Sequence, residues 1–246
     1  TASLMVDTEQ SVFIPFLAVL IWSLATMVLG LRRSEAPAWF GAIRVGVQSL
    51  MGILPAWIAC LCAGVRSGSF RWSEIAASQG SGPMSWAAFS DPFQLLAMVV
   101  FLVSGMAVLG VAPLEGGYEH SDLSGGVFSR FSGTQVILFR IGRVYAFFVW
   151  ALITAVLFLG AWNLPEGIIA RLGEMGAGRT RLIAETVVLV AKTVFISGIL
   201  FWAARANPKT KIDQIADLIW KVLTPGAVIA LVGTTFWVGL QRWGGL

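Results

Sequence analysis

The feature that most constrains this chain of 246 residues is a set of six long apolar stretches. A helix needs roughly 20 apolar residues to cross the hydrocarbon core of a bilayer. The qualifying stretches cover residues 11–31, 45–65, 92–114, 144–164, 182–204 and 222–241. Segments of this length predict an all-α fold, a polytopic helical bundle of about six transmembrane helices. The connecting segments are short enough for one domain over residues 1–246.

The charge distribution supports a membrane location and excludes other classes. Asp, Glu, Lys and Arg make up 12% of the chain, about half their share in a soluble domain. Basic residues stand singly or in pairs between apolar stretches, which argues against nucleic acid as a partner. They are concentrated in the connections 32–44, 115–143 and 205–221, and this asymmetry predicts that these loops face the cytoplasm or the mitochondrial matrix.

The chain offers little for metal or covalent chemistry. His120 is the single histidine, which makes a histidine-based metal site improbable. Cys60 and Cys62 are two residues apart and point in different directions on a helix, so a disulfide between them is not expected. The sequence contains no nucleophile–base pattern. We expect no metal and no covalently bound cofactor.

Three stretches of the chain resemble one family, the quinone-site membrane component of respiratory complex I (its first, or H, subunit). The stretches are Gly30-Leu-Arg-Arg-Ser-Glu-Ala-Pro-Ala-Trp-Phe-Gly-Ala-Ile-Arg44 with Gln48 beyond it; Phe131-Ser-Gly133 with Leu157-Phe-Leu-Gly-Ala-Trp162; and Arg205-Ala-Asn-Pro-Lys-Thr-Lys-Ile-Asp213-Gln214 with Trp220-Lys221. They occur in the family's order and spacing. The resemblance covers nearly the whole chain and corresponds to the last six of the family's eight spans.

The resemblance implies a subunit of an NADH:quinone oxidoreductase that is not catalytic alone. Such a subunit would help shape the quinone chamber and couple electron transfer to proton translocation. Quinone would be the substrate of the complex, and this chain would hold no flavin or iron–sulfur cluster. The implied partners are other membrane-arm and peripheral-arm subunits and phospholipids. The implied location is the mitochondrial inner membrane or the bacterial cytoplasmic membrane.

The densest group of titratable residues lies in the connection 115–143, which we expect to be the functional loop. It consists of Glu115, Glu119, His120 and Asp122. Carboxyl groups crowded near a membrane raise one another's pKa, so the group could relay protons or tune a quinone headgroup. The alternative is a solvated acidic loop. The whole connection could also lie along the membrane surface or pack against a partner.

Glu185 and Lys192 lie in or near the fifth span. An ionisable group inside a membrane is costly and therefore a functional candidate. Seven residues separate the two, which places them on one helix face, where a water chain could join them in a proton relay. The alternative is that Glu185 is interfacial and a neighbouring helix or subunit satisfies Lys192.

Three further pairs are site candidates: Arg44 with Gln48, Arg205 with Asp213, and Arg140 with Arg143. The resemblance gives the first two pairs a place in the quinone chamber or in docking of the peripheral arm. The alternatives are a span anchor with an inter-helix hydrogen bond for the first pair and an ion pair fixing the loop for Asp213. We expect the third pair to contact phospholipid headgroups or an acidic partner, or simply to anchor the membrane edge.

Several acidic positions of the family are not acidic here. They fall on Ile53, Val108 and Arg143, and an Arg of the family pattern falls on Val111. These departures leave two alternatives open. The chain could be the homologous subunit of a hydrogenase or formate-hydrogenlyase-type complex, or a structural anchor that has lost proton and quinone chemistry.

Overall fold

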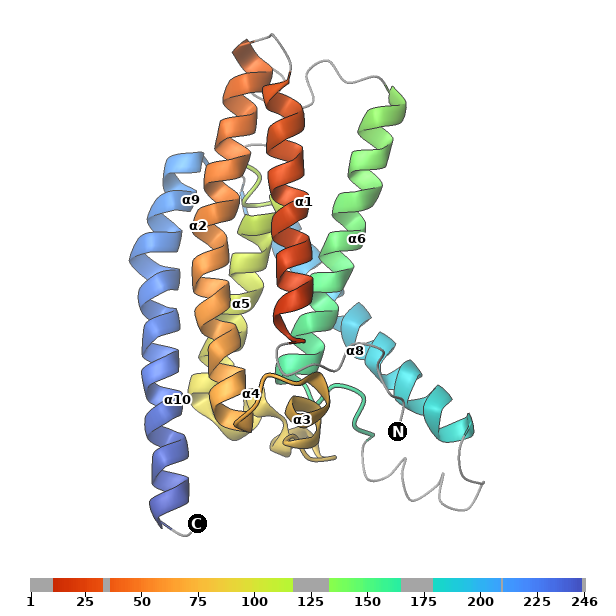
Figure 1. The fold of residues 1–246 in the computed structure, drawn as a ribbon, viewed down its shortest axis with the longest axis vertical. Helices are drawn as coiled ribbons and strands as arrows, with labels where there is room; N and C mark the ends of the chain where they lie inside the picture. Colours follow the sequence, from red (N-terminus) through yellow and green to blue (C-terminus); the bar gives the residue numbers. More distant parts are fainter. Residues whose placement is uncertain (1–10, 33–35, 117–132, 165–178, 209, 245–246) are drawn as a thin grey trace.

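The computed structural model describes residues 11–32, 36–116, 133–164, 179–208 and 210–244. This part of the chain contains helices and no strand (Figure 1). Six helices are long and apolar enough to cross a membrane: Phe13–Leu31, Ala38–Ser67, Pro92–Leu109, Gly133–Phe158, Arg181–Ala206 and Ile212–Trp243. The expected all-α membrane bundle is therefore confirmed.

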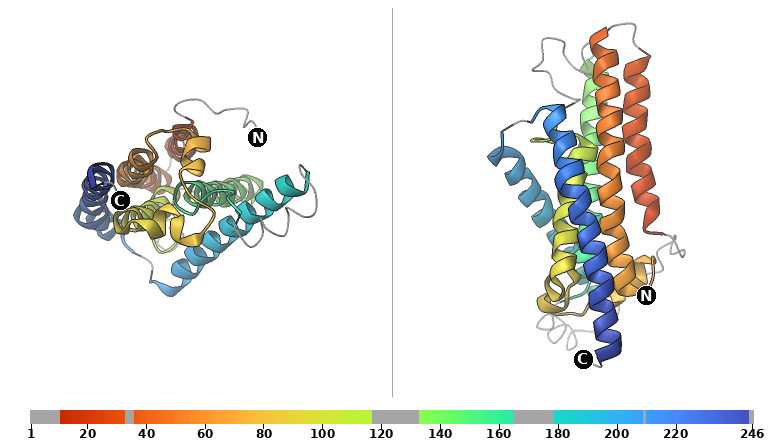
Figure 2. Two further views of the ribbon diagram at one scale, coloured as in Figure 1. Left: turned by 90° about the horizontal axis from the view of Figure 1, so that it is seen from below. Right: turned by 90° about the vertical axis from the view of Figure 1, so that its left-hand side faces the viewer.

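Two helices form the centre of the bundle. Helix α2 (Ala36–Ser67) packs along α5 (Pro92–Leu109), and both also contact α10 (Thr224–Gly244). Helix α1 (Phe13–Leu31) lies against α2, while α6 (Gly133–Phe158) contacts α5 and α8 (Arg179–Ala206). Helices α8 and α10 lie on different sides of the central pair, and α8 is strongly tilted (Figure 2).

Short helices complete the described architecture. Between α2 and α5 lie α3 (Trp72–Ala77), η1 (Pro83–Ser85) and α4 (Ala87–Ser90), which close one end of the bundle. Helix α9 (Ile212–Leu218) and the π-helical turn η2 (Ile219–Leu223) run directly into α10. Pro225 has no N–H to donate to the preceding turn. The wide turn is closed by Thr224, whose Oγ1 donates to the Ile219 carbonyl at 2.8 Å.

The observed helix ends differ from the predicted spans at several places. Helix α2 begins at Ala36 rather than at residue 45. Helix α5 ends at Leu109, before residue 114, because Gly110 adopts a left-handed conformation with φ 56°. Helix α6 ends at Phe158, before residue 164, because Gly160 and Ala161 have φ 74° and 45°. It begins at Gly133 rather than at residue 144. The last part of the expected functional loop is therefore a helix continuous with the fourth span.

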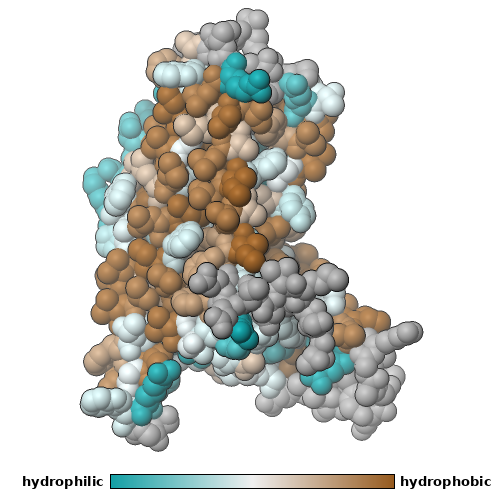
Figure 3. Space-filling model, in the orientation of Figure 1, coloured by the Kyte–Doolittle hydropathy of each residue, from teal (hydrophilic) through white to brown (hydrophobic). Residues whose placement is uncertain are grey.

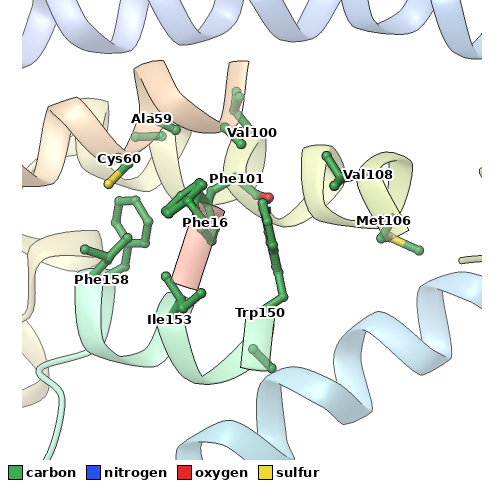
Figure 4. Close-up of a cluster of buried hydrophobic side chains, with 14 of the residues drawn as sticks. Phe16, Ala59, Cys60, Val100, Phe101, Met106, Val108, Trp150, Ile153 and Phe158 are labelled. Atoms are coloured by element: carbon green, nitrogen blue, oxygen red, sulfur yellow. Dashed lines mark hydrogen bonds between the residues drawn. The ribbon is translucent and has the colours of Figure 1, made fainter. Parts of the chain in front are cut away.

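Aromatic side chains from three helices fill the core (Figure 4). Phe101 stacks on Trp150 with ring centroids 4.7 Å apart, and Phe16 meets both rings edge-on at 5.4 Å. The Trp150 indole N–H donates to the Phe101 carbonyl at 3.1 Å, so its polar atom is satisfied within the apolar core. This cluster ties α1, α5 and α6 together.

Apolar side chains also dominate the outer surface (Figure 3). Large examples on α8 and α10 include Ile183, Phe201, Trp202, Val232 and Phe236, all more than half exposed. In water such a surface would promote aggregation. Against lipid it is the expected exterior of a membrane bundle, in agreement with the location predicted from the sequence.

Candidate functional site

The candidate site is built around Gln48, which is buried on α2. Its Nε2 donates to the carbonyl of Ala107 at 2.7 Å and to that of Leu114 at 2.6 Å. The first carbonyl belongs to the last turn of α5 and the second to the segment that follows it. One side chain thereby fixes the path of the chain as it leaves α5.

Two serines hold the same end of α5. Ser49 on α2 and Ser23 on α1 both donate from Oγ to the Val108 carbonyl, at 3.1 and 3.3 Å. The last carbonyls of a helix lack partners within the helix and need donors from elsewhere. Here neighbouring helices supply those donors, so α1 and α2 are positioned against the start of the segment 110–116.

The segment 110–116 also binds the connection between α8 and α9. Thr210 donates to the Pro113 carbonyl from its backbone N at 3.0 Å and from Oγ1 at 2.8 Å. Gly116 lies so close to α9 that a Cβ there would be 3.3 Å from Cα of Ile212 and 3.2 Å from Oε1 of Gln48. A larger residue would separate the three segments.

Arg143 of α6 closes the arrangement from the other side. Its Nη1 donates to the Gly110 carbonyl at 3.2 Å and lies 4.0 Å from Oε1 of Glu115. Both side chains are about one quarter exposed. We call the contacts of Gln48, the segment 110–116, Thr210, Arg143 and α9 the inter-segment network.

The network brings together two of the stretches that carry the family resemblance and the first half of α6. Gln48 comes from the first stretch, Thr210 and the first turn of α9 belong to the third, and Arg143 lies between the two parts of the second. The first and third stretches are far apart in the sequence and meet at one end of the bundle, whereas residues 157–162 of the second stretch lie at the other end, where α6 ends (Figure 1). Chemically the site offers a rigid backbone path with one carboxylate and one guanidinium at its edge.

Other candidate residues lie on the surface near this end. Arg44 is exposed, whereas Gln48, one helical turn away, is buried. The two side chains therefore lie in different surroundings. Arg140 is exposed, whereas Arg143, expected to share its surroundings, turns inward. Arg205 is exposed, with its guanidinium 4.8 Å from the Phe201 ring centre. Asp213 is exposed in the first turn of α9.

Part of the predicted acidic cluster cannot be placed. Glu119, His120 and Asp122 lie outside the described residues. Glu115 is the one member that the structure locates, beside Arg143. The relay role predicted for the cluster therefore stays a prediction.

Glu185 and Lys192 have separate contacts. Glu185 pairs with Arg181 one turn earlier at 2.9 Å. The Lys192 ammonium donates to the carbonyls of Leu159 and Ala161 at 2.7 and 3.0 Å and lies 4.2 Å from the Trp86 ring centre. A cation at a helix C-terminus stabilises the free carbonyls there, so Lys192 anchors α8 to the end of α6.

Sequence reasoning missed a polar cluster beside this lysine. Gln79, fully buried, donates from Nε2 to the Val156 and Leu157 carbonyls and accepts from the Gly160 and Ala87 backbone N–H groups at Oε1. It lies in a polar stretch that resembles an ordinary loop in composition. Only its contacts with α6 show that it caps the end of that helix.

Comparison with known proteins identifies the family. A family model described as NADH dehydrogenase matches residues 2–235. The H subunit of NADH-quinone oxidoreductase from Anaeromyxobacter dehalogenans is 29% identical over 219 residues, 86% of this chain and 53% of the relative. The protein of the same name from Chlorobaculum parvum is 28% identical over 234 residues, 94% of this chain and 65% of the relative.

A third relative comes from Methanosarcina mazei. Its F(420)H(2) dehydrogenase H subunit is 30% identical over 200 residues, 81% of this chain and 53% of the relative. The chain thus spans between about half and two thirds of the length of these relatives. Because the family model covers nearly all of the chain, this protein belongs to the NADH dehydrogenase family, among the relatives of the NADH-quinone oxidoreductase H subunit.

Proposed function

We propose that this chain is the membrane component of H-subunit type in a complex I-type NADH:quinone oxidoreductase. Its part is to shape the quinone chamber and to couple electron transfer to proton translocation, together with membrane-arm and peripheral-arm subunits. The observation that carries the proposal is the inter-segment network. It joins the first and third family-like stretches to the end of α5 and the segment that follows it, through hydrogen bonds of Gln48 and Thr210.

We propose separate roles for the residues of this end. Gln48 and Thr210 position backbone, because each bonds to main-chain carbonyls. Glu115 and Arg143 are the ionisable pair within the network and are the candidates for proton movement. Arg44, Arg205 and Asp213 are exposed outside the bundle core and suit docking of a hydrophilic subunit.

The electron donor of the complex is open to a second candidate. The relatives include the H subunit of F(420)H(2) dehydrogenase, at 30% identity. This observation favours a scaffold that serves complexes with different donors. NADH and the reduced F(420) donor are therefore to be compared as substrates of the purified assembly.

Purification from native membranes tests assembly. A tagged chain, extracted in mild detergent, is expected to co-migrate with peripheral-arm subunits and with donor:quinone oxidoreductase activity. Migration of the chain without any such subunit would refute the proposal.

Substitution of Glu115 separates coupling from a purely structural anchor. Glu115→Gln is expected to lower quinone reduction or proton pumping in an assembled complex, because it removes the charge that faces Arg143. Glu74→Gln, which changes an exposed carboxylate paired with Arg71 on α3, is the matched control. Unchanged activity and pumping in Glu115→Gln would favour the anchor.

A further inference from the structure

Three helices meet at the end of the bundle opposite the inter-segment network. They are the last turns of α2, the first turn of α5 and the second half of α10 (Figure 1). Four buried side-chain atoms here have no hydrogen-bond partner among the described residues: Oδ2 of Asp91, Oε1 of Gln94, Oγ1 of Thr234 and Nε1 of Trp237. Most buried polar atoms in folded proteins bond to protein or to ordered water.

Cys62 on α2 lies close to Asp91, Gln94 and Thr234. Its carbonyl accepts from Nε2 of Gln94 at 2.8 Å. Its thiol interacts with Asp91 and Thr234, and donates to the carbonyl of Ile58 at 3.3 Å. A thiol is only a weak hydrogen-bonding group, so it leaves the Thr234 hydroxyl without a strong partner.

The packing of α5 on α10 places this group at a close helix contact. A Cβ at Gly233 would overlap the ring of Phe93, so the two backbones approach closely there. Thr234 follows Gly233 directly, and Trp237 lies three residues further on the same face of α10. Asp91, Gln94 and Thr234 are each at most 1% exposed.

The Asp91 carboxylate is only half satisfied. Oδ1 accepts from the Phe93 N–H at 2.9 Å, which caps α5. The Arg66 guanidinium also faces this carboxylate, while its Nη1 donates to the Ala87 carbonyl and to Oγ of Ser90. Burial raises the pKa of Asp91, and the Phe93 amide and Arg66 oppose that rise.

We propose that ordered water binds at this junction, between Asp91 and Gln94 of α5 and Thr234 of α10. The atoms to be satisfied include carboxylate and amide oxygens, which accept, and an indole N–H, which donates. A ligand that both donates and accepts matches this set. A buried water typically makes about three hydrogen bonds to such groups.

A metal cation fits the same atoms less well. The Arg66 guanidinium already supplies positive charge beside Asp91, and an indole N–H cannot ligate a cation. Across the described ranges no group of three or more His, Cys, Asp or Glu could hold a metal ion. The water site stands on this geometry alone and is independent of the proposed function.

Hydroxyl-radical labelling by X-ray radiolysis of water tests the proposal, because radicals formed from bound water oxidise adjacent side chains. Cys62 and Cys60 are a matched pair of buried thiols on α2. Cys60 packs near Phe158 and Phe16 in the apolar core (Figure 4). In the full chain, purified from native membranes with its bound subunits, we expect Cys62 to be oxidised severalfold faster than Cys60. Equal rates, slow or fast, would overturn the proposal.

A threonine substitution tests the same site from the protein side. Thr234→Val removes a hydroxyl at nearly constant volume and is expected to slow Cys62 oxidation towards the rate of Cys60. Thr154→Val is the control, because its buried hydroxyl already donates within α6, to the Trp150 carbonyl at 2.9 Å. If Thr234→Val does not fold, the ratio of the two cysteines in the natural chain still decides. An unfolding temperature that rises with sodium and falls in Thr234→Val alone would assign a cation instead.

Discussion

Gln48 holds three parts of the chain through one amide group. It reaches the Ala107 and Leu114 carbonyls, and its side chain borders Gly116. A buried acceptor that loses its donor costs more free energy than a hydrogen bond normally contributes. Replacing Gln48 is therefore expected to cost more free energy than the loss of one ordinary hydrogen bond.

Gln48→Leu is expected to lower the free energy of unfolding by about 2 kcal/mol, because two buried carbonyls lose their donor. Quinone reduction by the assembled complex should fall as well, since the segment 110–116 loses its fixed path. Thermal unfolding of the purified chain and the activity of native membranes measure the two effects. Gln241→Leu, at an exposed position near the end of α10, should change neither. Equal behaviour of the two variants would refute the role of Gln48.

Ala161 occupies a backbone conformation that suits glycine. Its φ is 45°, and an L-residue there costs about 1 kcal/mol. Ala161→Gly is therefore expected to raise the free energy of unfolding by up to about 1 kcal/mol. Ala155→Gly makes the same change inside α6 and should lower stability, because glycine weakens a helix interior. Scanning calorimetry of both variants gives the sign of each change in the free energy of unfolding. If Ala161→Gly lowered this free energy as much as Ala155→Gly does, the expectation would be contradicted.

Asp91 gives the stability of the chain a pH dependence of defined sign. Its pKa is raised in the folded state by burial. Between the ordinary pKa of Asp, about 3.9, and the raised value, the folded chain holds a proton that the unfolded chain has lost. Stability therefore falls as pH rises through this window and is level on either side. Unfolding temperatures are to be measured from acid to neutral pH for the natural chain and for Asp91→Asn. The unfolding temperature should fall with rising pH in the natural chain and not in Asp91→Asn. Asp217→Asn, at an exposed ion pair with Lys221, should keep this fall.

Helix packing depends on small residues where two elements cross. On α5, a Cβ at Gly105 would overlap Nε1 of Trp150, the indole that stacks on Phe101. On α8, Gly198 has nothing within 4 Å of such a Cβ. The same residue type thus has different consequences on different helices, and only the packing distinguishes them.

Gly105→Ala is expected to destabilise the chain by about 1–3 kcal/mol, because the overlap forces α5 and α6 apart. Gly198→Ala should be neutral or stabilising by up to about 1 kcal/mol, since alanine favours a helix and meets no neighbour. Thermal unfolding followed by tryptophan fluorescence reports both, with Trp150 in the core as a local probe. A Gly105→Ala variant as stable as Gly198→Ala would contradict the described α5–α6 contact.

The elements were predictable to the extent that local composition decides them. Twenty or so apolar residues demand a helix in a membrane, so six spans follow from length alone. Their ends do not follow, because left-handed residues such as Gly110 and Gly160 end helices inside apolar runs. The helical start of α6 at Gly133 was missed, because its polar residues resemble a loop.

The site was predictable only in part. Gln48 was found through resemblance to a family, and the structure gives it a buried, bonding role. Thr210 and Gln79 were missed, because a threonine or glutamine in a polar loop carries no signal until its distant carbonyl partners are known. Hydrogen bonds between remote segments are a property of the packed bundle rather than of any local pattern.

At the scale of the whole molecule, the bundle has two polar ends and an apolar middle and exterior. One end holds the inter-segment network, and the other holds Lys192, Gln79 and the junction around Asp91. The first and third family-like stretches lie at the first end, and residues 157–162 of the second stretch lie at the other. Because Gln48, Glu115 and Arg143 lie at the first end, we expect quinone contacts there and not at the second end.

A photoreactive quinone, activated in native membranes and mapped by mass spectrometry, tests this placement most directly. We expect cross-links on residues 107–116 or 210–215 that an excess of unlabelled quinone removes and that Gln48→Leu reduces. Competed cross-links confined to the opposite end, on residues 71–91, or no competed cross-link on this chain within an active complex, would contradict this placement.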